Sequence, residues 1–383
     1  MTLSELFSNY KTHQEKQLFH RYINNKMIEP LLNNLPDNFE VKVIGKSVLG
    51  KPIYGIKVGS GKKRLLFWSQ MHGNESTTTK AIFDVFNTLQ ETDTICLDIL
   101  NKCTVMFIPI LNPDGAEAYT RVNANKVDLN RDAKQLTQPE SVALKNVFQT
   151  FKPHYCFNLH GQRTIFGAGK TGNVASLSFL SPAADKFQSI TKSRKQAMEI
   201  ISVVNNVLQN EIPNQIGRYD DTYNENCVGD TFQSLGIPTI LYEAGHYNGD
   251  YGREKTRELV FQSLLVAVHY ITFNSVDGKN NNSYFEIPQN EKCFFDIIIR
   301  NAKLDNTNDV LDLAFQYHEE LVDGKIIFKP FLEKIDKLDN FYGHNELNVN
   351  GDIVSAPDFD NFKAGYSNDF VFINDKKYSL LLS

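Results

Sequence analysis

The stretch RLLFWSQMHGNEST, residues 64–77, contains a short apolar run that is followed directly by polar side chains. Residues 64–69 are nearly all apolar, which is typical of a strand buried on both faces of a sheet. His72 and Glu75 come just after this run, and the apolar residues of 77–89 then recur at helical spacing. A buried strand, a polar turn and a helix in this order indicate an α/β fold.

The same order recurs along the chain up to about residue 275. We expect further strands at 105–111, 154–159 and 239–242, with helices between them that include a long one at 184–208, and a hairpin at 44–58. This alternation predicts an α/β domain over residues 1–275, with a mixed, largely parallel central sheet that is flanked by helices.

The composition of the chain changes after this domain. Residues 276–283, VDGKNNNS, are polar and rich in turn-forming residues, so we expect a linker there. Beyond the linker, short strand-like runs and turn signals such as Asp323-Gly324 predict a smaller β-rich accessory domain over residues 283–383. At the other end of the chain, the pattern of residues 1–35 is typical of an amphipathic helix.

Charge and hydropathy argue against several classes of partner. The 383 residues include 40 Lys and Arg against 45 Asp and Glu, so no basic field exists to attract nucleic acid or anionic lipid. The N-terminus does not resemble a secretory signal, and no run of apolar residues is long enough to predict a membrane span. The five scattered cysteines are typical of free thiols in a reducing compartment. We therefore expect a cytoplasmic protein that binds neither nucleic acid nor membrane, while its oligomeric state stays open.

Polar side chains follow four of the predicted strands at the point where each strand ends. His72 follows RLLFWS, Asn112 follows VMFIPIL, His160 follows HYCFNL and Glu243 follows TILY. Ligands of open α/β sheets bind beyond the carboxyl ends of the strands, so these side chains are expected at one site. Imidazole and carboxylate groups are suitable zinc ligands, and catalytic zinc commonly has three protein ligands and a water. His72 and Glu75 alone would more often form a solvated turn that caps the next helix, and His160 alone would more often be structural. The further motifs along the chain favour a metal site.

Five motifs occur in order over about residues 40–270: IGKSVLGKPIYGIKVG, MHGNEST, LNPDGAEAYTRVNANKVDLNRD, FNLHG and TILYEAG. Together and in this order they resemble the motifs of the zinc carboxypeptidase family M14. The resemblance implies a zinc-dependent metallocarboxypeptidase with the family's α/β fold in the 1–275 domain. It also implies one Zn²⁺ per chain, with His72, Glu75 and His160 as the metal ligands.

The resemblance further implies roles for residues around the metal. Glu243 resembles the general base that takes a proton from the attacking water and delivers it to the leaving amine. Arg121 resembles the arginine that stabilises the oxyanion of the transition state. Asp128 resembles the acid that accepts a hydrogen bond from a ligand histidine and thereby fixes its orientation.

Substrate-binding residues are implied in the same way. Asn130 and Arg131 resemble the pair that holds the terminal carboxylate of the substrate, to which a planar guanidinium can donate two hydrogen bonds. Tyr223 is the candidate for the family's substrate-capping tyrosine, although Tyr219 lies close to it in the sequence. Residues 227–231, CVGDT, fall where the family shapes its pocket for the substrate side chain, and the side-chain preference stays open.

Other activities are compatible with parts of this pattern. Related zinc deacylases, similar to aspartoacylase or succinylglutamate desuccinylase, share HxxE, a DLNR-like run and a later histidine, and they cleave small N-acyl amino acids. A murein-peptide amidase and a non-catalytic binding module are further alternatives. The NPDG motif and the long segment between Arg131 and Glu243 favour the peptidase, and the intact ligand set argues against a binding module. The expected substrate is therefore a peptide, or a small N-acyl amino acid, with a free carboxylate.

Gly161 is a departure from the family pattern. It follows His160 directly, where many members of the family have serine. We therefore expect the local contacts to the substrate backbone to differ from those of such members.

Overall fold

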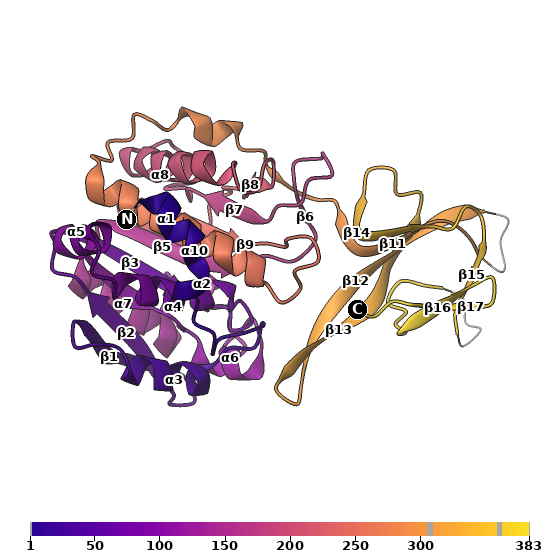
Figure 1. Ribbon diagram of the computed structural model, residues 1–383, viewed down its shortest axis with the longest axis horizontal. Coiled ribbons are helices and arrows are strands. Elements are labelled where there is room, and N and C mark those ends of the chain that lie inside the picture. The colour runs from indigo at the N-terminus through magenta and orange to yellow at the C-terminus, as the bar shows by residue number, and fades with distance from the viewer. Residues whose placement is uncertain (1, 305–308, 358–361, 383) are drawn as a thin grey trace. The chain divides into compact units, whose positions relative to one another are not determined.

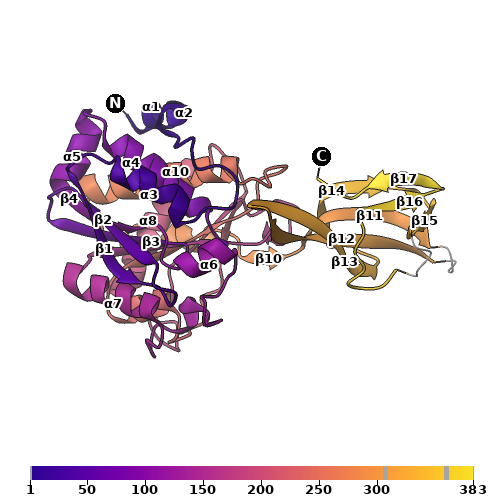
Figure 2. The same ribbon diagram turned by 90° about the horizontal axis from the view of Figure 1, so that it is seen from below.

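The computed structural model of the chain describes residues 2–304, 309–357 and 362–382 (Figure 1 and Figure 2). The described residues fall into two compact units. Unit 1 comprises residues 1–162 and 175–290, and unit 2 comprises residues 163–174 and 291–383. The predicted linker at 276–283 thus lies within unit 1, and the short segment 163–174 belongs to unit 2 although unit 1 precedes and follows it in sequence.

Within the described residues, unit 1 is built on an eight-stranded mixed sheet with the strand order β1-β2-β4-β3-β5-β9-β7-β8. The central strands β4, β3, β5 and β9 run parallel to one another, whereas β1 and β2 form an antiparallel hairpin at one edge. The strands are β1 (Phe39–Lys46), β2 (Pro52–Val58), β3 (Lys63–Ser69), β4 (Cys103–Ile108), β5 (Tyr155–Gly161), β7 (Leu177–Leu180), β8 (Ile216–Arg218) and β9 (Thr239–Ala244). The predicted mixed, largely parallel sheet is confirmed.

Helices pack on both faces of this sheet (Figure 1). The longer α-helices are α4 (Thr77–Leu89), α7 (Pro139–Phe151), α8 (Lys192–Leu208) and α10 (Glu254–Phe273). Shorter helices are α1 (Leu3–Ser8), α2 (Tyr10–His13), α3 (Asn25–Asn33), α5 (Thr94–Lys102), α6 (Pro113–Ala118), α9 (Val228–Ser234) and the 3₁₀ turns η1 (Leu129–Arg131) and η2 (Asn282–Glu286). Successive residues of a strand face opposite sides, so Phe67 packs in the core with α4, α8 and α10 while Trp68 packs with α7 and α9.

Two predicted helices are shorter than expected. Residues 2–35 form the three short helices α1, α2 and α3 instead of the one amphipathic helix that was expected. Between α2 and α3, the Arg257 guanidinium donates hydrogen bonds to Glu15 O and Leu18 O, and these bonds compete with helix formation. The helix expected over 184–208 begins only at Lys192, where the Thr191 side chain caps it by accepting a hydrogen bond from the Arg194 N–H.

In its described part, unit 2 contains a seven-stranded sheet with the order β13-β12-β11-β15-β16-β17, in which β14 also pairs with β11. The strands are β11 (Phe294–Leu304), β12 (Val310–Val322), β13 (Lys325–Asp336), β14 (Tyr342–Asn348), β15 (Ile353–Ser355), β16 (Phe370–Ile373) and β17 (Lys376–Ser379), and a separate pair joins β10 (Asn290–Lys292) to β6 (Phe166–Ala168). Asp323 and Gly324 both have positive φ between β12 and β13, as a tight hairpin turn requires. The predicted C-terminal β-rich region is confirmed.

Among the described residues, no helix combines the length and the apolar character that are needed to cross a membrane.

Candidate active site

The predicted metal ligands come together at the carboxyl edge of the parallel strands. Nδ1 of His72 lies 2.9 Å from Glu75 Oε1, and Nδ1 of His160 lies 3.0 Å from Glu75 Oε2. The two Nδ1 atoms are 3.1 Å apart, and both imidazole rings are 2% exposed. Two imidazole nitrogens and a carboxylate that converge in this way form a donor set suited to a zinc ion with an open coordination position.

The loop that carries His72 and Glu75 is fixed by a close contact with α6. A Cβ atom at Gly73 would lie only 1.9 Å from the backbone carbon of Gly115, so no side chain fits at this position. The NPDG motif supports the same loop, because Asn112 donates through its backbone N–H to Gln70 O at 3.1 Å and through Nδ2 to Met71 O at 3.2 Å. Gly73 and the NPDG motif therefore hold in place the loop that carries the predicted ligands His72 and Glu75.

Asp128 orients the first ligand. His72 Nε2 donates to Asp128 Oδ1 at 3.0 Å, which fixes the ring and leaves Nδ1 to face the other ligands. Burial by itself would lower the pKa of His72, but the charges of Glu75 and Asp128 outweigh it and raise this pKa to about 9 in the metal-free chain. For His160, burial prevails and the pKa is lowered.

Arg121 joins the same cluster from the loop after α6. Its Nε donates to Asp128 Oδ2 at 3.1 Å, and its NH1 lies 3.4 Å from Glu75 Oε1. The Arg121 side chain is half exposed, so the guanidinium can meet both solvent and a bound molecule. Burial opposes ionisation of Asp128, but the hydrogen bond and charge of His72, together with the charge of Arg121, hold the pKa of Asp128 below its usual range.

Glu243 lies on β9 directly beside the metal cluster. It is paired in register with His160 on β5, and its Oε2 is buried without a hydrogen-bond partner. Burial, and then the negative charge of Glu75, raise the pKa of Glu243 well above its usual value, although His72 and Arg121 act in the opposite direction. A carboxyl group with a raised pKa in this position is suited to accept and return a proton.

Asn130 and Arg131 lie next to the segment that was predicted to shape the side-chain pocket. The Asn130 N–H donates to Asp128 Oδ1 at 2.9 Å, and Asn130 Oδ1 accepts from the Val228 N–H at 2.9 Å. Arg131 is exposed, and its NH1 lies 3.1 Å from Cys227 Sγ. The 3₁₀ turn η1 thus links Asp128, and through it the metal cluster, to the N-terminus of α9.

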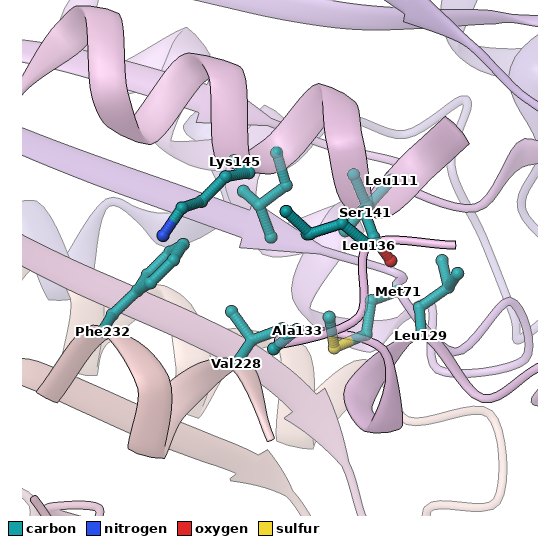
Figure 3. A pocket seen from close by; sticks show the side chains of 10 residues that line it. Met71, Leu111, Leu129, Ala133, Leu136, Ser141, Lys145, Val228 and Phe232 are labelled. Carbon is teal, nitrogen blue, oxygen red and sulfur yellow. The ribbon is translucent and has the colours of Figure 1, made fainter. Parts of the chain in front are cut away.

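A small apolar pocket is lined in part by the loops that carry His72 and Asp128 (Figure 3). It is lined by Met71, Leu111, Leu129, Ala133, Leu136, Ser141, Leu144, Lys145, Val228 and Phe232. Met71 precedes His72 in the chain, and Leu129 separates Asp128 from Asn130. The loops therefore bury their apolar side chains in this region while they present polar neighbours to the site, which anchors the polar groups.

The tyrosine with the clearest electrostatic link to the site is Tyr219 rather than Tyr223. Burial, and then the negative charges of Glu243 and Glu75, raise the pKa of Tyr219 far above its usual value. Tyr223 lies four residues further on, in the segment between β8 and α9. The sequence could not distinguish the two, because the distance along the chain to Glu243 does not fix the path of this segment. The role of Tyr223 stays a prediction.

Comparison with known proteins identifies the family to which the chain is similar. The family model described as zinc carboxypeptidase matches residues 25–226, which is more than half of the chain. Human carboxypeptidase D is 24% identical over 221 residues, which cover 50% of this chain and 16% of that protein. A probable carboxypeptidase 2 from Trichophyton verrucosum is 29% identical over 111 residues, which cover 28% of this chain and 21% of that protein. The matched regions are thus small parts of these relatives.

Solved structures share the fold at low sequence identity. A putative carboxypeptidase A from Shewanella denitrificans has a TM-score of 0.54 at 16% identity, covering 64% of this chain and 68% of that chain. Bovine thrombin-activatable fibrinolysis inhibitor has a TM-score of 0.53 at 16% identity, covering 67% of this chain and 97% of that chain. Because the family model spans most of the ordered motifs and the predicted ligands lie together, we conclude that the chain belongs to the zinc carboxypeptidase family M14.

Proposed function

We propose that the protein is a metallocarboxypeptidase that hydrolyses the C-terminal amide bond of peptides. The observation that carries the proposal is the convergence of His72, Glu75 and His160 beside Glu243, whose Oε2 atom is buried. The three ligands would hold one Zn²⁺ per chain. When bound, zinc acts as a Lewis acid and lowers the pKa of a coordinated water.

Glu243 moves the proton in the proposed reaction. It accepts a proton from the attacking water and then donates it to the nitrogen of the leaving amine. The raised pKa of Glu243 supports this role, because it makes the carboxylate a stronger base toward the attacking water. Arg121, which is held by Asp128 and Glu75, donates hydrogen bonds to the oxyanion that develops on the scissile carbonyl.

Asn130 and Arg131 select a substrate with a free C-terminus. The exposed guanidinium of Arg131 can bind the terminal carboxylate with two hydrogen bonds, and the Asn130 amide group supports it from the same 3₁₀ turn. Cys227 lies against Arg131, so the start of α9 contributes to the pocket for the C-terminal side chain of the substrate. The requirement for a carboxylate separates this proposal from an endopeptidase.

The proposal is tested by metal-dependent release of the C-terminal residue. Peptides with free C-termini are incubated with the protein after removal of metal by a chelator, and again after zinc is restored. We expect no release from the metal-free protein and full release after zinc is added. Release at an equal rate from the metal-free protein would show that the metal cluster is not required.

A further inference from the structure

Arg253 is a buried arginine that reaches the backbone beyond the ends of two active-site strands. It immediately precedes α10, and its side chain is 2% exposed. Its NH1 donates to Ala244 O at 2.7 Å and to Gly245 O, and its NH2 donates to Gln162 O at 3.0 Å. One cation thus joins carbonyl groups that come from two different strands.

These carbonyl groups follow the candidate catalytic residues closely in the chain. Gln162 comes two residues after His160 on β5, and Ala244 comes directly after Glu243 on β9. The two strand ends are also joined by the Gln162 N–H, which donates to Ala244 O at 3.0 Å. Any relative shift of the strand ends at this point would therefore change the placement of His160 and Glu243.

The Gln162 side chain extends the same network. Its Nε2 donates to Ala175 O at 2.8 Å, and its Oε1 accepts a hydrogen bond from Asn290 Nδ2 at 2.9 Å. The chain leaves unit 1 after Gln162, returns to it at Ala175 and leaves it again after Asn290. The Gln162 side chain therefore bonds both Ala175, where the chain returns to unit 1, and Asn290, where it leaves unit 1 again. Gln162 itself comes two residues after the proposed ligand His160.

The backbone of Arg253 has a left-handed conformation, with φ of 60°. A side chain in this conformation is strained, whereas glycine adopts it without strain. Arg253 occupies the N-cap position of α10, but a guanidinium has no acceptor with which to cap the first N–H groups of a helix. Its donors instead reach the carbonyl groups of Gln162, Ala244 and Gly245.

We propose that Arg253 is a positioning residue for hydrolysis: it ties the ends of β5 and β9 together so that His160 and Glu243 keep their relative placement. The inference rests on the proposed function, since it concerns the step in which Glu243 acts. Misplacing a catalytic group by about 1 Å costs on the order of 10²-fold in rate, so we expect Arg253→Met to lower kcat by about that factor. KM should change little, because Arg131, which is proposed to bind the substrate carboxylate, lies on η1 and not on β5 or β9. A shift of His160 would also weaken zinc binding, so kcat is measured at saturating zinc and the zinc content of each variant is determined.

The experiment compares kcat, KM and bound zinc of the zinc-loaded full chain and its variants on a peptide with a free C-terminus. Lys63→Met is the matched control, because Lys63 Nζ donates to Ile271 O, Thr272 O and Asn274 O at the opposite end of α10. We expect Lys63→Met to lower the midpoint of thermal unfolding without lowering kcat. Arg253→Lys, which keeps the charge but reaches fewer carbonyl groups, should have a kcat between those of Arg253→Met and the unchanged protein.

The outcomes separate this inference from the proposed function. A folded, zinc-loaded Arg253→Met variant with an unchanged kcat would overturn it, and so would an equal loss of kcat in Lys63→Met. If Arg253→Met does not fold, Arg253→Lys decides: a lowered kcat at constant KM and zinc content supports the inference, and an unchanged kcat contradicts it. If the unchanged protein releases no C-terminal residue, the proposed function has failed instead.

Discussion

His160 on β5 and Glu243 on β9 occupy paired positions on adjacent parallel strands. Side chains at paired positions point to the same face of a sheet, so the register of these two strands places a predicted metal ligand beside the half-buried Glu243. Glu75 completes the arrangement, because its carboxylate contacts His160 and its charge contributes to the raised pKa of Glu243. The proposed chemistry depends on this pairing.

Replacing Glu243 by glutamine should remove nearly all turnover and leave the metal in place. The amide has nearly the same shape as the carboxyl group, but it cannot accept and return a proton. General acid–base groups commonly contribute about 10²- to 10⁴-fold, so a loss of that order in kcat is expected. Glu199→Gln is a matched control, because Glu199 is also buried but bonds Tyr270 and Gly278 away from the metal cluster. Full activity in Glu243→Gln would show that another group is the base.

Replacing either ligand histidine by alanine should release the metal. His72 and His160 each supply one donor atom to the cluster, and a site with two remaining ligands binds zinc far more weakly. Elemental analysis after dialysis measures the zinc content. His13→Ala is the control, since His13 is equally buried but lies against Glu91, outside the cluster. One zinc per chain in His72→Ala or His160→Ala would remove that residue from the ligand set.

Zinc affinity should rise as the pH is raised from about 7 to about 9, by up to about tenfold per unit, because zinc binds only the deprotonated ring. The pKa of His72 is about 9 in the metal-free chain, above its ordinary value of 6.5, since the charges of Glu75 and Asp128 outweigh burial. Protonated His72 therefore stabilises the metal-free fold most fully below pH 6.5, and this contribution is lost as the pH rises through 9.

Competition with a chelator of known pH dependence measures this effect. Asp128→Asn removes one of the carboxylates that raise the pKa of His72, so its affinity should approach a plateau at a lower pH. Zinc affinity that is constant across this range in the unchanged protein would contradict the protonation state that we assign to His72.

Replacing Arg131 by alanine should weaken the hydrolysis of peptides with a free C-terminus far more than that of their amidated counterparts. The lost guanidinium can no longer bind the terminal carboxylate, which amidated peptides lack. The ratio of kcat/KM for matched free and amidated peptides measures the effect. Lys134→Ala is the control, because Lys134 is an exposed cation close in sequence that pairs with Glu225 on the surface. An unchanged ratio in Arg131→Ala would exclude carboxylate recognition by Arg131.

Much of the fold could be predicted from the sequence because local signals agreed with the tertiary structure. The apolar run at 64–69 and the helical spacing at 77–89 correspond to β3 and α4 almost residue for residue. His72, Glu75 and His160 could be predicted as a group because the motifs around them resemble those of the zinc carboxypeptidase family, and because the sequence places His72 and His160 after buried strands. In residues 1–35 the local pattern failed, because the distant Arg257 provides hydrogen bonds that compete with helix formation.

The supporting contacts of the site could not be predicted in the same way. Arg253 reaches Gln162 only because its own backbone adopts a left-handed conformation and because β5 and β9 are neighbours in the sheet. Tyr219 and Tyr223 could not be ranked, since the path of an irregular segment depends on tertiary packing. Sequence patterns thus identified the groups proposed to do the chemistry, whereas the groups that hold them required the structure.

The most direct test of the central claim is a mass-spectrometric analysis of products from a mixture of substrates. The zinc-loaded protein is given peptides with free C-termini, the same peptides with amidated C-termini, cell-wall peptides and small N-acyl amino acids. We predict removal of single C-terminal residues from the free peptides, with loss of this activity when zinc is removed or when Glu243 is replaced by glutamine. Cleavage of only the N-acyl amino acids, or of free and amidated peptides at equal rates, would contradict the assignment as a carboxypeptidase.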